Sequence, residues 1–129
     1  MEKFSWNGET FLSGHKVIDH EHQFLVKSYN DLIDQINLGH SSLEALKLQL
    51  SSMLELLRQH FYHEELLLST SNETAHQKLV EQHAALIIQL EQEMNQIKQL
   101  SDLQQVLQQL AQWLQQQIPY EAIEFRKLV

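Results

Sequence analysis

The sequence contains no cysteine, one proline and three glycines, and each of these scarcities excludes a class of protein. Without cysteine the chain has no disulfide scaffold, no thiolate metal site and no cysteine nucleophile. So few turn-forming residues are unlike an all-β sandwich or barrel. A hydrophobic content of 43% is too high for a disordered chain. The composition therefore favours a largely helical globular protein.

Long apolar runs and clustered positive charge are also missing. No apolar run approaches the roughly 18 residues that indicate a membrane span, and the first residues lack the basic and apolar regions of a signal peptide. A formal net charge of −8 argues against electrostatic binding of nucleic acid or anionic lipid. We therefore expect a cytoplasmic chain with neither nucleic acid nor membrane as a partner, and the sequence indicates no particular protein partner.

The 129 residues suffice for one ordinary domain, with an irregular arm over residues 1–17 and helices over 18–129. Apolar residues in the second part recur at steps of three and four, which predicts helices with one buried face each. Helix starts are expected at Asp19, at Ser41 with Glu44 as a capping box, after the polar residues 69–72, and at Ser101 or Asp102. The third helix should reach Ile97, and Pro119 should kink or break the fourth near Ile118. Short loops predict an all-α, up-down-up-down antiparallel four-helix bundle.

Eight histidines form a high share of the chain, and several of them interrupt apolar helix faces. Counted along the helices from the expected loops, His22, His60, His83 and Gln117 fall at one level, and Glu64 lies one turn from His60. Imidazoles and a carboxylate suit iron, zinc, copper or manganese, and their burial is costly without a partner. A single buried histidine is more often a core residue that hydrogen-bonds to a backbone carbonyl than a metal ligand. Three histidines at one level, however, favour a metal site. The remaining histidines expected on the surface are His15, His20, His40 and His63.

Two sequence motifs resemble those of bacterial hemerythrins, namely IDHEH at residues 18–22 and HFYHEE at residues 60–65. An aromatic arm containing Trp6, the helix with His83, and Trp113-Leu114 extend this resemblance over nearly the whole chain. The resemblance implies a four-helix bundle with an oxo-bridged pair of irons that binds O2 reversibly. In the family the ligands are five histidines, one glutamate and one aspartate.

Four residues match the ligand positions of the family, and they are our predicted metal ligands: His22, His60, Glu64 and His83. Three other positions depart from the pattern and carry Leu79, Gln117 and Ala122. One iron thereby loses two of its three histidines and one carboxylate bridge. We therefore expect one non-haem iron in place of a di-iron pair, with zinc and manganese as alternatives.

Whether a neighbouring side chain replaces the lost ligands is left open by the sequence. His76 lies one turn before Leu79, Gln117 offers an amide oxygen, and Glu121 directly precedes Ala122.

The function we expect is that of a hemerythrin-like metal-binding protein that binds or senses oxygen. The alternative is a metal-free degenerate bundle that acts in protein contacts or regulation. An enzyme of the ferritin-like carboxylate type would need two Glu-x-x-His helices, and only Glu73–His76 has that spacing. No arrangement supports a nucleophilic hydrolase, so we do not expect an enzyme.

Overall fold

The computed structural model describes residues 1–128, and within this range it is all-helical, without strands. The helices are α1 (Gly8–Phe11), α2 (Lys16–Leu38), α3 (Leu43–Ser69), α4 (Glu73–Met94) and α5 (Leu100–Arg126). The prediction of an all-α chain is confirmed. None of the helices in residues 1–128 is long and apolar enough to cross a membrane.

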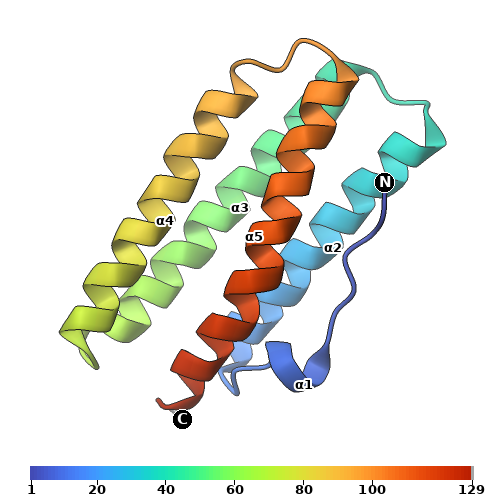
Figure 1. The fold of residues 1–129 in the computed structure, drawn as a ribbon. Coiled ribbons are helices and arrows are strands. Elements are labelled where there is room, and N and C mark those ends of the chain that lie inside the picture. Colours follow the sequence, from blue (N-terminus) through green and yellow to red (C-terminus); the bar gives the residue numbers. More distant parts are fainter. Residues whose placement is uncertain (129) are drawn as a thin grey trace.

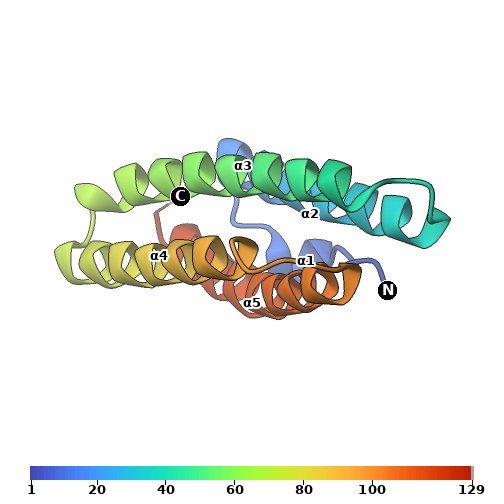
Figure 2. The same cartoon turned by 90° about the horizontal axis from the view of Figure 1, so that it is seen from above.

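The four long helices lie side by side along a common direction (Figure 1). The α2–α3 and α4–α5 loops lie at one end of the molecule, and the α3–α4 loop lies at the other. Viewed from above, α2 and α3 form one layer and α4 and α5 form the second (Figure 2). Helix α2 packs on α3, α3 on α4, and α5 on both α4 and α1. Short connections therefore bring residues from distant parts of the chain to the same level.

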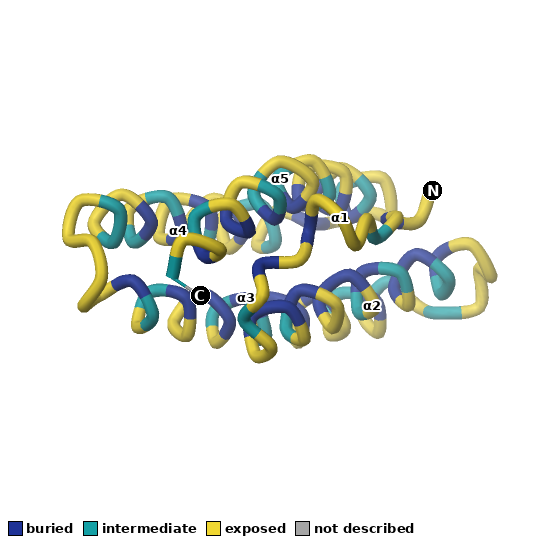
Figure 3. Tube along the Cα trace, turned by 90° about the horizontal axis from the view of Figure 1, so that it is seen from below, coloured by how far each residue is buried: buried dark blue, intermediate teal, exposed yellow. Residues whose placement is uncertain are grey.

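Along each long helix the buried residues lie on the side that faces the other layer (Figure 3). On α5 they form a stripe that includes Leu103, Leu107, Leu110 and Leu114, all at most 2% exposed. Steps of three and four residues keep such positions on one helix face, as the sequence pattern predicted. Continued at the same spacing, the buried face of α5 passes from the leucines to the polar residue Glu121, which is also buried.

Several helix boundaries differ from those predicted. Helix α2 begins before Asp19, with His15 at its N-cap, and Ser42 caps α3 in place of Ser41. The N-cap of α5 is Gln99, which forms a capping box with Asp102. Several polar residues near each of these helix starts can act as the cap, so the sequence alone does not determine which one does.

Two further corrections concern the last two helices. Helix α4 ends at Met94, and Ile97 is buried from the loop that follows. Helix α5 is not broken at Pro119 but continues to Arg126. The carbonyl that loses its donor at Pro119 belongs to Gln115, an exposed residue that water can reach. The helix can therefore tolerate the proline and carry Glu121 inward.

The N-terminal arm is attached to both layers and is less irregular than predicted, since it includes α1 and the start of α2. The carboxylate of Asp19 accepts hydrogen bonds from Ser13 N and Ser13 Oγ, both at 2.8 Å, and from Gly14 N at 3.0 Å. Arg126 on α5 donates to the carbonyls of Leu12 and Glu9. These contacts hold the arm against α2 and α5.

We expect Asp19→Ala to lower the free energy of unfolding by about 1.5–3 kcal/mol, because a buried carboxylate that accepts several hydrogen bonds is lost. Urea denaturation of the metal-free protein measures the change. Asp31→Ala is the matched control, since Asp31 forms an exposed pair with Lys27 at 3.0 Å, worth about 0.5 kcal/mol at most. Equal losses in the two variants would show that Asp19 does not anchor the arm.

Candidate metal centre

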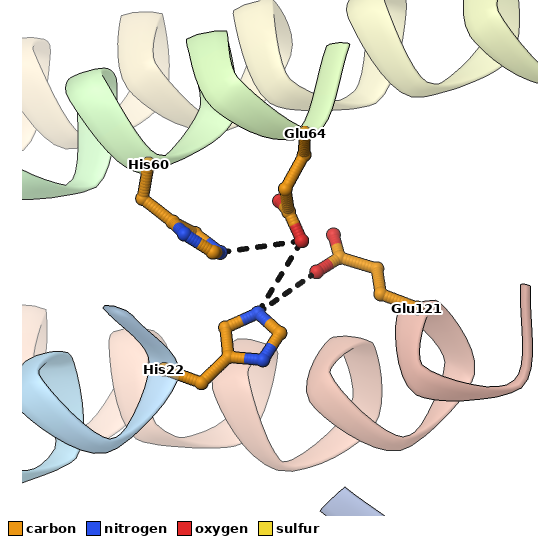
Figure 4. A group of neighbouring side chains, drawn as sticks. All are labelled: His22, His60, Glu64 and Glu121. Atoms are coloured by element: carbon orange, nitrogen blue, oxygen red, sulfur yellow. Dashed lines mark ion pairs between the residues drawn. The ribbon is translucent and has the colours of Figure 1, made fainter. Parts of the chain in front are cut away.

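Four buried side chains from three helices converge at one level between the two layers (Figure 4). They are His22 on α2, His60 and Glu64 on α3, and Glu121 on α5, and each is at most 2% exposed. Each offers one ligand atom, and these atoms all lie within 4.8 Å of one another. This group can hold a metal ion.

The ligand atoms lie close together, but most of them do not hydrogen-bond to one another. His22 Nε2 lies 3.3 Å from Glu64 Oε2 and 3.4 Å from Glu121 Oε2, and His60 Nε2 lies 3.2 Å from Glu64 Oε2. Despite these short distances, no hydrogen-bond partner within residues 1–128 satisfies His22 Nε2, His60 Nε2 or either oxygen of Glu64. Buried polar atoms without partners are costly, and a cation among them would satisfy several at once. The donor set therefore fits a metal ion.

His83 joins this layer from α4 but has a different role in the geometry. Its Nε2 forms a hydrogen bond of 3.1 Å with Glu121 Oε1 and lies 3.6 Å from Glu64 Oε1. The ring also stacks on Phe61, with a centroid distance of 3.6 Å and an interplanar angle of 4°. The prediction that the rings of His22, His60 and His83 meet inside the fold is confirmed. The fourth member of the closest group, however, is Glu121 and not His83, and His83 hydrogen-bonds to Glu121.

Helical spacing explains why these residues face inward. His60 and Glu64 are four residues apart on α3 and so share one face. On α5 the stripe of leucines continues through Gln117 to Glu121 at the same steps, provided that the helix runs through Pro119. Both carboxylates are thus positioned by long helices and not by loops.

The charges in this group influence one another strongly. Burial alone would lower the pKa of His60, but the charge of Glu64 and the hydrogen bond to Glu21 raise it to about 10. Burial would likewise lower the pKa values of His22 and His83, and their contacts with Glu121 and Glu64 raise them. Burial would raise the pKa of Glu64, but the charge of His60 and contacts with His22 and His60 hold it well below its usual range.

Glu121 behaves in the opposite way to Glu64. Burial and the neighbouring charge of Glu64 both raise the pKa of Glu121 above its ordinary value. Without a metal these shifts favour protonated histidines, an ionised Glu64 and a Glu121 that more readily keeps a proton. A metal ion would have to displace these protons, so metal binding and proton release are coupled.

Comparisons with known proteins supply no relative for this chain. No family model, curated protein or solved structure matches it. The chemistry of the site therefore follows from its own distances, burial and charges.

The three positions that depart from the hemerythrin pattern have distinct surroundings. Leu79 packs in an apolar cluster with Ile18, Leu68 and Phe125, and Ala122 is fully buried. Gln117 Oε1 is buried and has no hydrogen-bond partner within residues 1–128. Leu79 and Ala122 have apolar side chains and cannot bind a metal.

The possible replacement ligands and the other histidines differ in burial and in their distance from the group. His76 is half-buried and lies outside the closest group of ligand atoms, whereas Glu121 lies within it. His20, His40 and His63 are exposed as predicted, but His15 is half-buried with its ring against Phe125. The surface prediction is wrong for His15 because α2 begins earlier and places this residue at its N-cap.

Glu121 is the group member absent from the predicted ligands. Its signal in the sequence was its position on the inward stripe of the fourth helix. The sequence offered Glu121 only as a possible replacement ligand, because a helix kinked or broken at Pro119 would leave the direction of its side chain undefined.

Proposed function

We propose that this chain is a hemerythrin-like, non-haem metal-binding protein with one ion held by His22, His60, Glu64 and Glu121. The single observation that carries the proposal is the convergence of four buried ligand atoms, several of them without a hydrogen-bond partner. The proposed architecture is an up-down-up-down antiparallel four-helix bundle. The loops at alternate ends of the molecule support it (Figure 1).

The chemistry of the ligands supports a first-row transition metal. Two imidazole nitrogens with carboxylate oxygens suit iron, zinc and manganese, and the sequence resemblance favours iron. Bound iron would supply redox chemistry toward a small molecule such as O2, which is the basis for proposing an oxygen binder or sensor. The chain itself contributes a site shielded from water by the burial of all four side chains, and His83 holds Glu121 in place at 3.1 Å.

A metal-free bundle that acts through protein contacts is the second candidate. It is favoured by the charge balance of the site, because protonated His22 and His60 can compensate the buried charge of Glu64. In that case the cluster would stabilise the fold without binding a ligand.

Elemental analysis of the purified protein, with an absorption spectrum in air, separates the two candidates. We expect about one metal ion per chain, because the four closest ligand atoms all lie within 4.8 Å of one another and can surround one ion. Glu121→Ala should lose the ion, whereas His76→Ala should retain it, since His76 lies outside the group. Two irons per chain with intense near-ultraviolet bands would show that His83 also binds iron. No bound metal after incubation with iron, zinc or manganese would favour the metal-free candidate.

A further inference from the structure

Two carboxylates outside the metal-binding group contact the outer nitrogens of two buried histidines, one within the group and one beside it. Glu21 Oε1 lies 3.0 Å from His60 Nδ1, and Glu65 Oε2 lies 3.1 Å from His83 Nδ1. Among the described residues no partner reaches His22 Nδ1. His60 is therefore the proposed ligand whose orientation is fixed by a second carboxylate.

Glu21 is itself held in place from the solvent side. Its second oxygen, Oε2, lies 2.6 Å from Nδ1 of His63, whose side chain is 45% exposed. The side chain of Glu21 is 22% exposed, against 2% for His60, and it borders an open pocket of about 250 Å³ beside Phe24 and Gln59. Glu21 thus connects a surface histidine to a buried one.

The direction of the hydrogen bond determines which nitrogen of His60 faces the metal site. Because a carboxylate oxygen accepts, His60 Nδ1 carries the proton that it donates to Glu21, so Nε2 is the nitrogen that gives up its proton and offers a lone pair when a metal binds. Carboxylates that hold the outer nitrogen of a ligating histidine fix its tautomer and ring orientation and raise its basicity.

We propose that Glu21 is a positioning residue that prepares His60 to bind the metal ion. The inference rests on the proposed function, since it assigns a role toward the ion held by His60. Glu65 provides an internal comparison, because it makes the same contact at nearly the same distance but with His83, which lies outside the closest group of ligand atoms and faces Glu121 at 3.1 Å and Glu64 at 3.6 Å. Loss of Glu21 should therefore weaken metal binding more than loss of Glu65.

Titration of the folded, metal-free full chain with cobalt(II), followed by visible absorption, tests the proposal. We expect Glu21→Ala to raise the Kd for cobalt by about 10–100-fold, the usual effect of losing such an outer carboxylate. Glu21→Gln should recover part of the affinity, because its amide oxygen can still accept the hydrogen bond from His60 Nδ1. Circular dichroism at the titration temperature verifies that each variant is folded. If Glu21 only stabilised the fold, the folded Glu21→Ala variant would bind cobalt with an unchanged Kd.

The outcomes separate this inference from the proposed function. Failure of the unaltered protein to bind cobalt or iron would overturn the proposed function and the inference with it. Unaltered binding combined with an unchanged Kd in Glu21→Ala would overturn only the positioning role. An equal or larger loss in Glu65→Ala would also overturn it, since that result would show that His83 and not His60 governs the affinity.

Discussion

Replacement of His60 by alanine should abolish the stabilisation that the protein gains from a bound metal. An ion that binds only the folded state adds RT ln(1 + [L]/Kd), about 2.7 kcal/mol at a hundredfold excess over Kd. His60 is buried, its Nε2 faces Glu64 at 3.2 Å, and its ring lies 4.4 Å from that of His22. Without this imidazole the group loses one of its two nitrogen ligands. The metal-dependent part of the stability should therefore disappear.

Urea denaturation with added metal and with a chelator measures this difference for each variant. Comparing each variant with itself removes the cost of the substitution to the metal-free fold. His40→Ala is the matched control, because His40 is exposed in the loop between α2 and α3 and should leave the difference intact. A metal-dependent difference of the same size in His60→Ala would rule out His60 as a ligand.

Much of the layer could be predicted from the sequence because helical geometry leaves few alternatives. Once short loops join long helices, residues at equal distances from a loop must lie at the same level. This reasoning placed His22, His60 and His83 together, and the structure buries all three rings around Glu64. The apolar stripes also follow directly from residue spacing, so the helices themselves were predictable.

The order of side chains within the layer could not be predicted, because it depends on differences smaller than one helical turn. His83 and Glu121 are both inward, but side-chain packing against Phe61 places His83 beside Glu121 and outside the closest group. The course of α5 through Pro119 could not be predicted either, because a proline can break a helix or be accommodated within it, and the local sequence does not decide between the two. The helix caps predicted for α2, α3 and α5 were wrong for a related reason, because several polar residues near each helix start can act as the N-cap.

The charge network of the metal-free site should make Glu64 one of the most important residues for stability. Glu64 is fully buried, and its oxygens lie 3.2–3.6 Å from the Nε2 atoms of His22, His60 and His83. Removing one partner of a buried ion pair typically costs about 3–5 kcal/mol, because the other charge is left uncompensated. We expect a loss of this size for Glu64→Gln near pH 6 in the presence of a chelator.

The loss should depend on pH in a direction set by the pKa shifts. The pKa of His60 rises from 6.5 to about 10 on folding, so its contribution is fully present below pH 6.5 and is lost as the pH rises toward 10. The pKa of Glu64 is lowered from 4.5, so its contribution is present above pH 4.5 and is lost as the pH falls below it. Their joint stabilisation is therefore complete between these limits, from pH 4.5 to 6.5.

Unfolding curves of Glu64→Gln and of the unaltered protein across pH 6–10 should therefore converge as the pH rises, because His60 becomes neutral and no longer needs a counter-charge. Glu55→Gln is the matched control, since Glu55 is an exposed residue paired with Arg58 at 3.2 Å and should change stability little at any pH. If the cost of Glu64→Gln stayed constant over this range, it would come from shape and hydrogen bonding alone. His60 would then not be the charged partner of Glu64, and the proton-for-metal exchange inferred for this site would lose its physical basis.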